Sequence, residues 1–516
     1  MAFRYITFAG NTFFHKATRL SAVMALAGVL PACTVGPDFI SPPEPTANRF
    51  LPDQKAAVIG RTAAVPRVVW GGDVPAEWWR HLGSPTLNRL IEDGIANNAD
   101  LESAEAALRV AQTNITIQRA ALFPLITAGF DSSRNKATNA LSPPTNSNSY
   151  LYSLNTGQVN VSFLPDIWGG TRRQIESVKA QTRATAFQRE AVYISLTANI
   201  ALTAIMEASL RGQIAATNNI IGTQNQLLGI LRRQYTGGQI AQTDVVAQET
   251  AVAQARLLLP PLERALGQQR NLLATLTGRF PDERIAANFT LKSFRLPRKV
   301  PLSLPADLVR SRPDIRLAEE HLHAANAQIG VAVANRLPQL ALSANAGSSA
   351  QALSQLFSPS VGFWTLAGNL SQTVFDAGAL AARQQGAEEA TLQAGAQYRS
   401  TVLVAFQNVA DVLRALQSDA RALNAAHAAE RSASQNIGLI RKQVDAGQIS
   451  LPLLLTAQQA QLQASLARVQ AEAQQIADTV ALFQALGGGW WNRPNAVYPI
   501  HVEPPVTLAE GFLQPD

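Results

Sequence analysis

LRRQYTGGQI at residues 231–240 aligns without a gap on IRKQVDAGQI at residues 440–449, at an offset of 209 residues. A second match, at an offset of 214, begins at Asp100, and a third, at an offset of 210, begins at Asp166. Three matches in the same order, with nearly constant offsets, are typical of one structural unit that is used twice. The sequence therefore predicts an internal duplication with a unit of roughly 210 residues.

The sequence of each half predicts long helices. No proline occurs between Pro165 and Pro260 or between Pro359 and Pro452, and strong helix formers dominate both spans. A single helix over Gly170–Tyr235 would be roughly 100 Å long at 1.5 Å per residue. Helices of globular domains are much shorter.

A seven-residue hydrophobic period in each half predicts left-handed supercoiled packing of the helices. The seam positions are Val245, Val252, Leu259, Leu266 and Leu273 in the first half, and Leu455, Leu462, Val469, Ile476 and Phe483 in the second. Pro260-Pro261 falls inside the first seam and should kink or interrupt it. The second seam has no such counterpart.

Four short segments rich in Thr, Ser, Tyr and Val alternate with polar loops. They are Leu125–Ser133, Tyr150–Phe163, Leu340–Ser348 and Phe363–Val374. Weak alternation over about ten residues is typical of transmembrane β-strands, although a small soluble antiparallel sheet would give the same pattern. Four strands cannot close a barrel, because the smallest transmembrane barrels have about eight strands. If these strands span lipid, several chains must share one barrel, and the pattern does not choose between two, three or four chains.

The composition excludes several classes of protein. Of the 516 residues, 47% are apolar and only 15% are charged, which excludes an intrinsically disordered chain. A mean hydropathy near zero argues against a polytopic helical membrane protein. The net charge of +7 is not concentrated in clusters, so we expect no nucleic-acid partner.

The N-terminal residues predict export and lipid attachment. Basic residues precede a short apolar run, Leu20–Leu30, as in a signal peptide. The run leads into Leu30-Pro31-Ala32-Cys33, which resembles a bacterial lipobox, and Cys33 is the only cysteine of the chain. An ordinary signal peptide with a chance cysteine is the alternative. We expect acyl chains on Cys33 to anchor the mature protein, since more than one chain anchors stably.

The sequence contains no convincing catalytic or metal-binding constellation. No G-x-S-x-G, H-E-x-x-H or Walker A string occurs, and Gly487-Gly-Gly489 follows a predicted helix instead of preceding one. His321 and His323 diverge by ~200° on a predicted helix, so they cannot bind one metal ion together. We expect both histidines to be solvated. The protein is predicted not to be an enzyme, to bind no cofactor or metal, and to depend on a partner for energy.

Several further segments share an order and spacing along the chain from about residue 30 to 492. They are Cys33-Thr-Val-Gly-Pro-Asp-Phe39, Trp78-Trp79-Arg80, Leu304-Pro305-Ala306-Asp307-Leu308, Arg312-Pro313-Asp314-Ile315-Arg316, Leu486-Gly-Gly-Gly-Trp490, and Tyr235 with Gly238 and Asp244. Together they resemble the outer-membrane factor family (the TolC-like superfamily), and within it the NodT-type outer-membrane lipoproteins of resistance-nodulation-division (RND) efflux systems.

The resemblance implies a mainly α-helical, internally duplicated fold with a small β part. Three identical chains would contribute four strands each to a twelve-stranded outer-membrane β-barrel, and their coiled-coil hairpins would form an α-barrel across the periplasm. The implied partners are outer-membrane lipid, a periplasmic adaptor (membrane fusion) protein and an inner-membrane RND transporter. The chain would divide into a signal peptide (1–32), a lipid-anchored extended segment (33–82), two outer-membrane efflux repeats (83–300 and 301–491) and a C-terminal tail (492–516).

The resemblance also implies a gate at the periplasmic ends of the hairpins, where this sequence departs from its relatives. Val444 and Asp445 replace an aromatic–basic pair before Gly447, and Thr456 replaces an acidic residue. The acidic role would then fall on Asp445 or Asp244. The other candidate gate residues are Tyr235, Arg232, Arg233, Arg441, Lys442, Leu451 and Leu455. The alternative explanation for the basic pairs is their position near helix C-termini, where the helix dipole favours positive charge. If charged groups do not hold the gate closed, closure would rest on apolar packing around Leu451 and Leu455.

These observations favour a passive exit duct of a tripartite efflux pump, which conducts small molecules from the periplasm to the exterior. One alternative with the same architecture is the outer-membrane exit duct of type I protein secretion, which the lipobox disfavours. Another is a structural, lipid-tethered periplasmic coiled-coil protein, which the paired strands with polar loops disfavour.

Overall fold

The computed structural model describes residues 34–47, 49–52, 67–136, 151–283, 285–297, 299–445, 448 and 451–494. The expected signal peptide, the expected lipid-attachment residue Cys33 and most of the expected C-terminal tail lie outside the described residues. Contacts divide the chain into two compact units. The first comprises residues 1–39, 114–179 and 323–392, and the second comprises residues 40–113, 180–322 and 393–516. Each unit therefore draws on both sequence halves.

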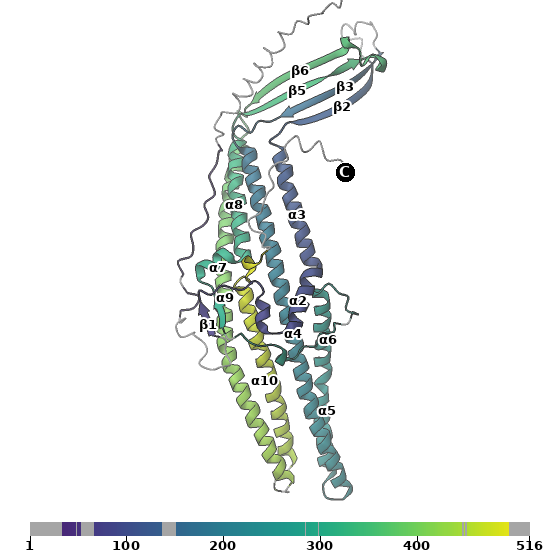
Figure 1. Ribbon diagram of the computed structural model, residues 1–516, viewed down its shortest axis with the longest axis vertical. Coiled ribbons are helices and arrows are strands. Elements are labelled where there is room, and N and C mark those ends of the chain that lie inside the picture. The colour runs from purple at the N-terminus through teal and green to yellow at the C-terminus, as the bar shows by residue number, and fades with distance from the viewer. Residues whose placement is uncertain are drawn as a thin grey trace, which may run out of the picture. The chain divides into compact units, whose positions relative to one another are not determined.

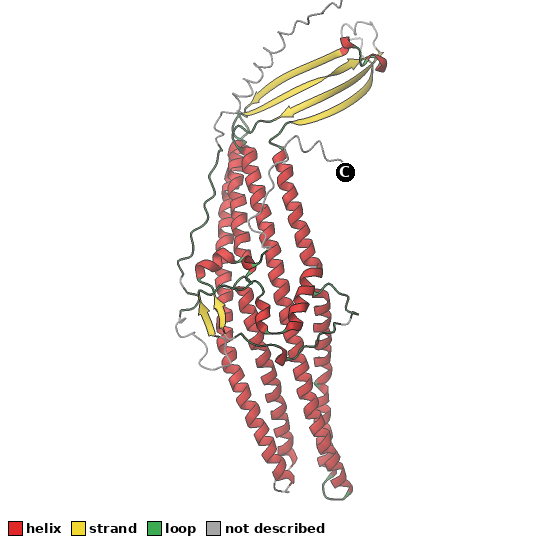
Figure 2. Ribbon diagram, in the orientation of Figure 1, coloured by secondary structure: helices red, strands yellow, loops and turns green. Residues whose placement is uncertain are grey.

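The described residues are mainly helical (Figure 1, Figure 2). The α-helices are α2 (Pro85–Asn97), α3 (Ala99–Ala120), α4 (Gly170–Thr236), α5 (Gln242–Leu257), α6 (Leu259–Leu276), α7 (Pro305–Ser311), α8 (Pro313–Ala334), α9 (Ala379–Asp445) and α10 (Leu451–Ala485). The strands are β1 (Arg67–Trp70), β2 (Leu125–Lys136), β3 (Leu151–Phe163), β4 (Lys299–Leu302), β5 (Gln339–Ala350) and β6 (Gly362–Ser371). Short 3-10 helices include η1 (Trp78–Leu82) and η5 (Trp490–Asn492). The predicted fold class, mainly α with a small β part, is confirmed.

Two very long helices occupy corresponding places in the two sequence halves. α4 and α9 each contain 67 residues, which makes each roughly 100 Å long. The length predicted for the first of them is confirmed. Among the described residues, α4 is the one helix long and apolar enough to cross a membrane, but 67% of its apolar window is buried within the protein. Its apolar stretch is therefore accounted for by packing.

The heptad seams are largely buried, and the proline pair breaks the first of them. In α10, Leu462, Val469, Ile476 and Phe483 are buried, and the helix runs unbroken. In the first half α5 ends and α6 begins around a single non-helical residue, which places Pro260-Pro261 in the first turn of α6. Proline is tolerated there because the first N–H groups of a helix have no intrahelical partner. The predicted interruption is confirmed.

A two-stranded parallel sheet was not predicted by the sequence pattern. β1 pairs with β4 so that Arg67 lies opposite Lys299 and Trp70 lies opposite Leu302. Each strand is only four residues long, which is too short for a period of two to be recognised.

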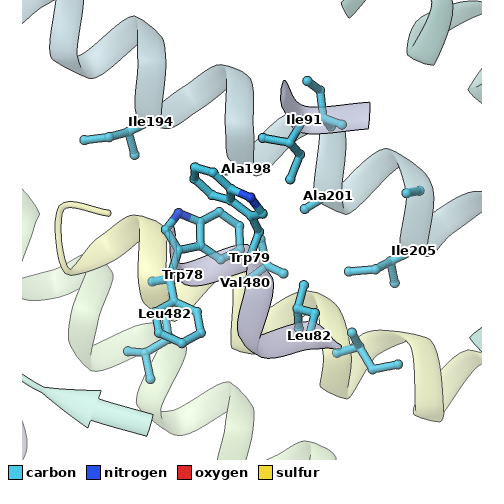
Figure 3. Packing of buried hydrophobic residues seen from close by; sticks show 14 of the residues in the cluster. Trp78, Trp79, Leu82, Ile91, Ile194, Ala198, Ala201, Ile205, Val480 and Leu482 are labelled. Atoms are coloured by element: carbon cyan, nitrogen blue, oxygen red, sulfur yellow. The ribbon is translucent and has the colours of Figure 1, made fainter. Parts of the chain in front are cut away.

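The core of the second unit gathers around two tryptophans of η1 (Figure 3). Trp78 stacks on Phe483 of α10 with ring centroids 5.4 Å apart, and it meets Trp79 edge-on at 5.8 Å. Apolar side chains of η1, α2, α4 and α10 surround the pair: Leu82, Ile91, Ile194, Ala198, Ala201, Ile205, Val480 and Leu482. The Trp78-Trp79 segment is therefore a core element that ties an early part of the chain to the last long helix.

A buried arginine links three helices of the same unit. Arg312, between α7 and α8, donates hydrogen bonds to the carbonyl of Ala485 at 2.9 Å and to the carbonyl of Ala405 at 3.4 Å. The carboxylate of Asp314 accepts two hydrogen bonds from the same guanidinium, at 3.0 and 2.6 Å. Because the last carbonyls of a helix have no intrahelical partner, this arginine satisfies the C-terminal end of α10.

A glycine triplet ends α10. Gly487, Gly488 and Gly489 have φ values of +87°, +62° and +68°, in the left-handed region that favours glycine. The N–H of Gly488 donates to the carbonyl of Phe483 at 2.9 Å, which closes the helix end. A Cβ on Gly489 would lie 2.4 Å from the carbonyl oxygen of Pro75. The triplet is thus a helix C-terminal turn.

We expect Gly489→Ala to lower the thermal unfolding midpoint, because a Cβ has no room and the backbone strain costs roughly 1–3 kcal/mol. Gly267→Ala in α6 is the matched control, since nothing lies within 4 Å of its Cβ position. Alanine there should stabilise the helix by roughly 0.5–1 kcal/mol. Circular dichroism of the detergent-solubilised protein during heating measures the unfolding midpoint of each variant. Equal midpoints for the two variants would contradict the tight turn.

Candidate functional site

One antiparallel sheet contains the strands β2, β3, β5 and β6 in that order. Figure 2 shows the four strands as one curved layer. All four strands predicted from the sequence are present, and their ends differ from the predicted ones by at most three residues. The β3–β5 pairing joins a hairpin from the first sequence half to a hairpin from the second.

The register of this sheet separates apolar from polar side chains. Directly paired residues lie on the same face, and successive residues lie on opposite faces. Over most of the sheet, one face carries Ile126, Ala128, Phe130, Val159, Val161, Phe163, Leu342, Ala344, Ala346, Trp364, Leu366 and Leu370. Toward the end of β2 and the start of β3 the same face carries the polar residues Ser132, Arg134 and Asn155. The other face is mostly polar and carries Thr127, Asp131, Ser133, Gln158, Asn160, Ser162, Ser343, Asn345, Thr365 and Asn369.

The apolar face is open in a single chain. Trp364 is 77% exposed, Leu366 is 75% exposed and Ile126 is 67% exposed. Contiguous apolar surface of this kind marks a contact with another protein or with a membrane. Apolar residues on one face and polar residues on the other are the pattern of a transmembrane barrel strand.

The two outer strands of the sheet each have one free edge. Among the residues that the structure describes, β2 pairs only with β3, and β6 pairs only with β5. Unpaired N–H and C=O groups cost several kcal/mol each in the hydrocarbon region of a bilayer. The sheet of one chain is therefore an arc that needs further strands before it can lie in a membrane.

A second candidate region lies where the helical hairpins of the second unit end. An apolar cluster, which we call the tip cluster, joins the α4–α5 hairpin to the α9–α10 hairpin. Its buried members are Leu227, Leu228, Leu231, Val245, Val252, Ile440, Leu454 and Ala457. Val444 and the predicted gate residue Leu455 pack against them. Apolar contacts therefore hold the two hairpins of one chain together near their turns.

The predicted gate residues of the first turn are exposed. Arg232 donates a hydrogen bond to Glu249 at 2.6 Å, between side chains that are 61% and 42% exposed. Arg233 and Tyr235 are also exposed, and the carbonyl of Tyr235 accepts the N–H of Gly238 at 2.9 Å. Glu249 was not predicted. The only sequence signal for it is its place on the helix that returns from the turn.

The predicted gate residues of the second turn are also at the surface where their side chains are described. Arg441 and Lys442 are exposed in the last turns of α9. Thr456 is exposed, and its hydroxyl donates to the carbonyl of Pro452 at 3.0 Å. Leu451 is the first residue of α10.

The two candidate acidic gate residues lie at helix ends. Asp244 is half-buried in the first turn of α5, where the helix dipole favours a carboxylate. Asp445 is the last residue of α9. Their action against basic residues of a neighbouring chain stays a prediction.

A carboxyl pair that was not predicted connects α9 to α10. Asp419 interacts with Asp478 through a side-chain hydrogen bond, and Asp478 also accepts a hydrogen bond from Gln474 at 3.1 Å. Burial, that hydrogen bond and the charge of Asp478 raise the pKa of Asp419 to about 7. Asp419 therefore keeps its proton up to about neutral pH.

One expectation about the histidines is wrong. His321 is exposed as expected, but the side chain of His323 is only 19% exposed. The ring of His323 stacks on Phe39 with centroids 4.2 Å apart, and its Nε2 lies 2.9 Å from Glu176 Oε1. Both partners come from distant parts of the sequence, so the local pattern around His323 carries no sign of them.

Comparison with known proteins decides the family. The family model described as outer membrane efflux protein matches residues 90–279 and 304–488. The chain belongs to the outer membrane efflux protein family. This assignment confirms the family resemblance and the efflux function predicted from the sequence: the protein is an outer-membrane channel for efflux. The family is one of channels and not of enzymes.

Curated relatives and solved structures agree with this assignment. The pyoverdine export outer membrane protein OpmQ of Pseudomonas putida is 31% identical over 422 residues, which cover 80% of this chain and 88% of the relative. The probable efflux pump outer membrane protein TtgC of Pseudomonas putida is 29% identical over 475 residues, covering 92% of this chain and 96% of the relative. The solved structure of the outer-membrane channel OprN has a TM-score of 0.80 at 26% identity and covers 89% of this chain and 100% of that one.

The carboxyl pair predicts a pH dependence of stability. The pKa of Asp419 in the folded state is raised from the ordinary 3.8 to about 7, so the contribution of this group is fully present below 3.8 and is lost as the pH rises through about 7. Asp419→Asn cannot ionise, so it should raise the thermal midpoint more at pH 8 than at pH 5. Asp411→Asn, on the same helix, is the control, because its carboxylate is exposed and accepts a hydrogen bond from Gln407. A gain that is the same at both pH values would contradict the raised pKa of Asp419.

Proposed function

We propose that three copies of this chain form a shared twelve-stranded outer-membrane barrel and act as the exit duct of a tripartite RND efflux pump. The observation that carries this proposal is the four-stranded arc with one apolar face, one mostly polar face and two open edges. Since neighbouring strands in the arc are all antiparallel, β6 of one chain would run antiparallel to β2 of the next, as a closed barrel requires. The number three comes from the family resemblance.

The complex extracted in detergent is expected to have about three times the mass of the mature chain. Closure is what makes the arc compatible with lipid, because every edge group then finds a partner. Light scattering on the size-fractionated complex, corrected for bound detergent, measures this mass. A folded, stable monomer would refute shared closure, and a mass of two or four chains would refute a twelve-stranded barrel.

We further propose that the duct is lipid-anchored through Cys33 and passive. The lipobox-like sequence that ends at Cys33 supports the anchor. An adaptor protein and an inner-membrane RND transporter would deliver the cargo and the energy. The names of the relatives, which refer to pyoverdine export and to efflux pumps, support small molecules as the class of cargo.

At the periplasmic mouth we propose that charged groups on the hairpin ends hold the closed state. A three-fold axis would repeat each of Asp244, Asp445 and the two basic pairs as a ring. Exposed ion pairs are worth only ~0.2–1 kcal/mol each, but three sets acting together would bias the equilibrium by about 1–3 kcal/mol. That bias corresponds to a roughly 5- to 150-fold change in the open population.

Replacing Asp244 and Asp445 together by Asn is therefore expected to raise the open probability or the single-channel conductance in planar bilayers. The increase should shrink at high salt, because screening already weakens the pairs of the unmodified protein. Glu263→Gln on α6 is the control for the loss of an exposed carboxylate away from the turns.

Leu454→Ala tests the competing explanation, because Leu454 is a buried member of the tip cluster. If Leu454→Ala opens the channel and the double aspartate variant behaves like the unmodified protein at low salt, closure rests on apolar packing and the charged gate is refuted.

A further inference from the structure

The segment Thr34–Phe39 lies against the start of α4 within the first unit. The N–H of Val35 donates to the carbonyl of Trp168 at 3.1 Å. Arg173 donates from Nε to the carbonyl of Val35 at 3.1 Å and from Nη2 to the carbonyl of Gly36 at 3.2 Å. The side chain of Arg173 is only 6% exposed. A buried guanidinium that binds two successive carbonyls recognises the backbone path of the segment.

Three glycines make this close approach possible. A Cβ on Gly36 would lie 2.4 Å from the Cα of Gly330 in α8, and a Cβ on Gly330 would lie 2.8 Å from the carbonyl oxygen of Val35. A Cβ on Gly169 would lie 2.4 Å from the Cγ2 of Thr34. The segment therefore crosses α8 at backbone contact distance, which requires glycine on both sides.

The far end of the segment is tied to the same arginine. Phe39 stacks on His323 at an interplanar angle of 8°, and Glu176 lies 2.9 Å from His323 and 2.8 Å from Arg173. Burial opposes ionisation of Glu176, but hydrogen bonds from Arg173 and His323 outweigh it, so the pKa of Glu176 lies below its ordinary value. An ionised Glu176 thus connects both ends of the segment into one network.

The expected anchor residue, Cys33, directly precedes this segment in the sequence. Thr34 is the residue after Cys33, so one peptide unit of ~3.8 Å separates the expected anchor residue from the docked segment. If the segment were released as far as Phe39, six residues could extend by about 20 Å. That reach is more than half of the ~30 Å thickness of the hydrocarbon core.

We propose that Thr34–Phe39 is a strap that fixes where the lipid anchor enters the membrane, and that Arg173 is its positioning residue. The proposal rests on acyl attachment at Cys33, which was proposed above. The strap docks beside the residues that connect the end of β3 to the start of α4. The depth of the anchor and the depth of the barrel strand are then set by one rigid contact instead of a flexible tether.

The test uses a spin label on Ile40→Cys, a residue next to the strap that is 85% exposed. Arg173→Met and Gly36→Ala should each raise the mobility of the label in proteoliposomes several-fold and broaden its depth distribution. Incorporation of radiolabelled palmitate and the helical circular dichroism should not change. Gly36 lies in the strap itself, so its variant separates release of the strap from any damage to the helices.

The internal repeat supplies the matched control. Arg383 corresponds to Arg173 at an offset of 210 residues and is exposed near the start of α9, so Arg383→Met should leave the label unchanged. Unchanged mobility in both strap variants, with palmitate still incorporated, would overturn the strap and leave the anchor standing. If the parent protein takes up no more palmitate than Cys33→Ser, acyl attachment is overturned and the role of the strap with it. An equal gain in mobility in Arg383→Met would overturn the role of Arg173.

Discussion

An open sheet edge cannot lie in hydrocarbon, and this constraint organises the rest of the protein. Each sequence half contributes one hairpin, and the β3–β5 pairing satisfies the inner edges of both. The outer edges of β2 and β6 are left for other chains. The membrane part of this protein is therefore incomplete as a single chain, and assembly becomes part of its folding.

In the helical part, the long helices α4 and α9 must be held in register with their neighbours over roughly 100 Å. The heptad positions Leu462, Val469 and Ile476 are buried along α10, but a seam alone permits sliding by whole heptads. Specific contacts outside the seam remove this freedom. Arg312 binds the carbonyl end of α10 and a carbonyl of α9 at once, and the Trp78–Phe483 stack fixes η1 against α10.

Elements whose residues follow a regular pattern along the sequence were predictable, whereas contacts between single side chains were not. Alternation over about ten residues located all four strands of the barrel sheet, and the lack of proline over long spans located α4. In contrast, the Arg232–Glu249 and Asp419–Asp478 pairs and the stacking of His323 on Phe39 each depend on single side chains that meet from different elements. The gate stays a prediction for a related reason, because it concerns contacts between chains.

The core around η1 also determines when this part of the protein can fold during biogenesis. Trp491 donates its indole N–H to Asp73 across 418 positions of sequence, at 3.0 Å, and Phe483 completes the stack on Trp78. These contacts cannot form until the last long helix has been synthesised. Contacts of such high sequence separation also form slowly, because a long loop must close first. The early part of the chain consequently waits for the late part, because η1 has no partner for the Trp78 stack until α10 has been made.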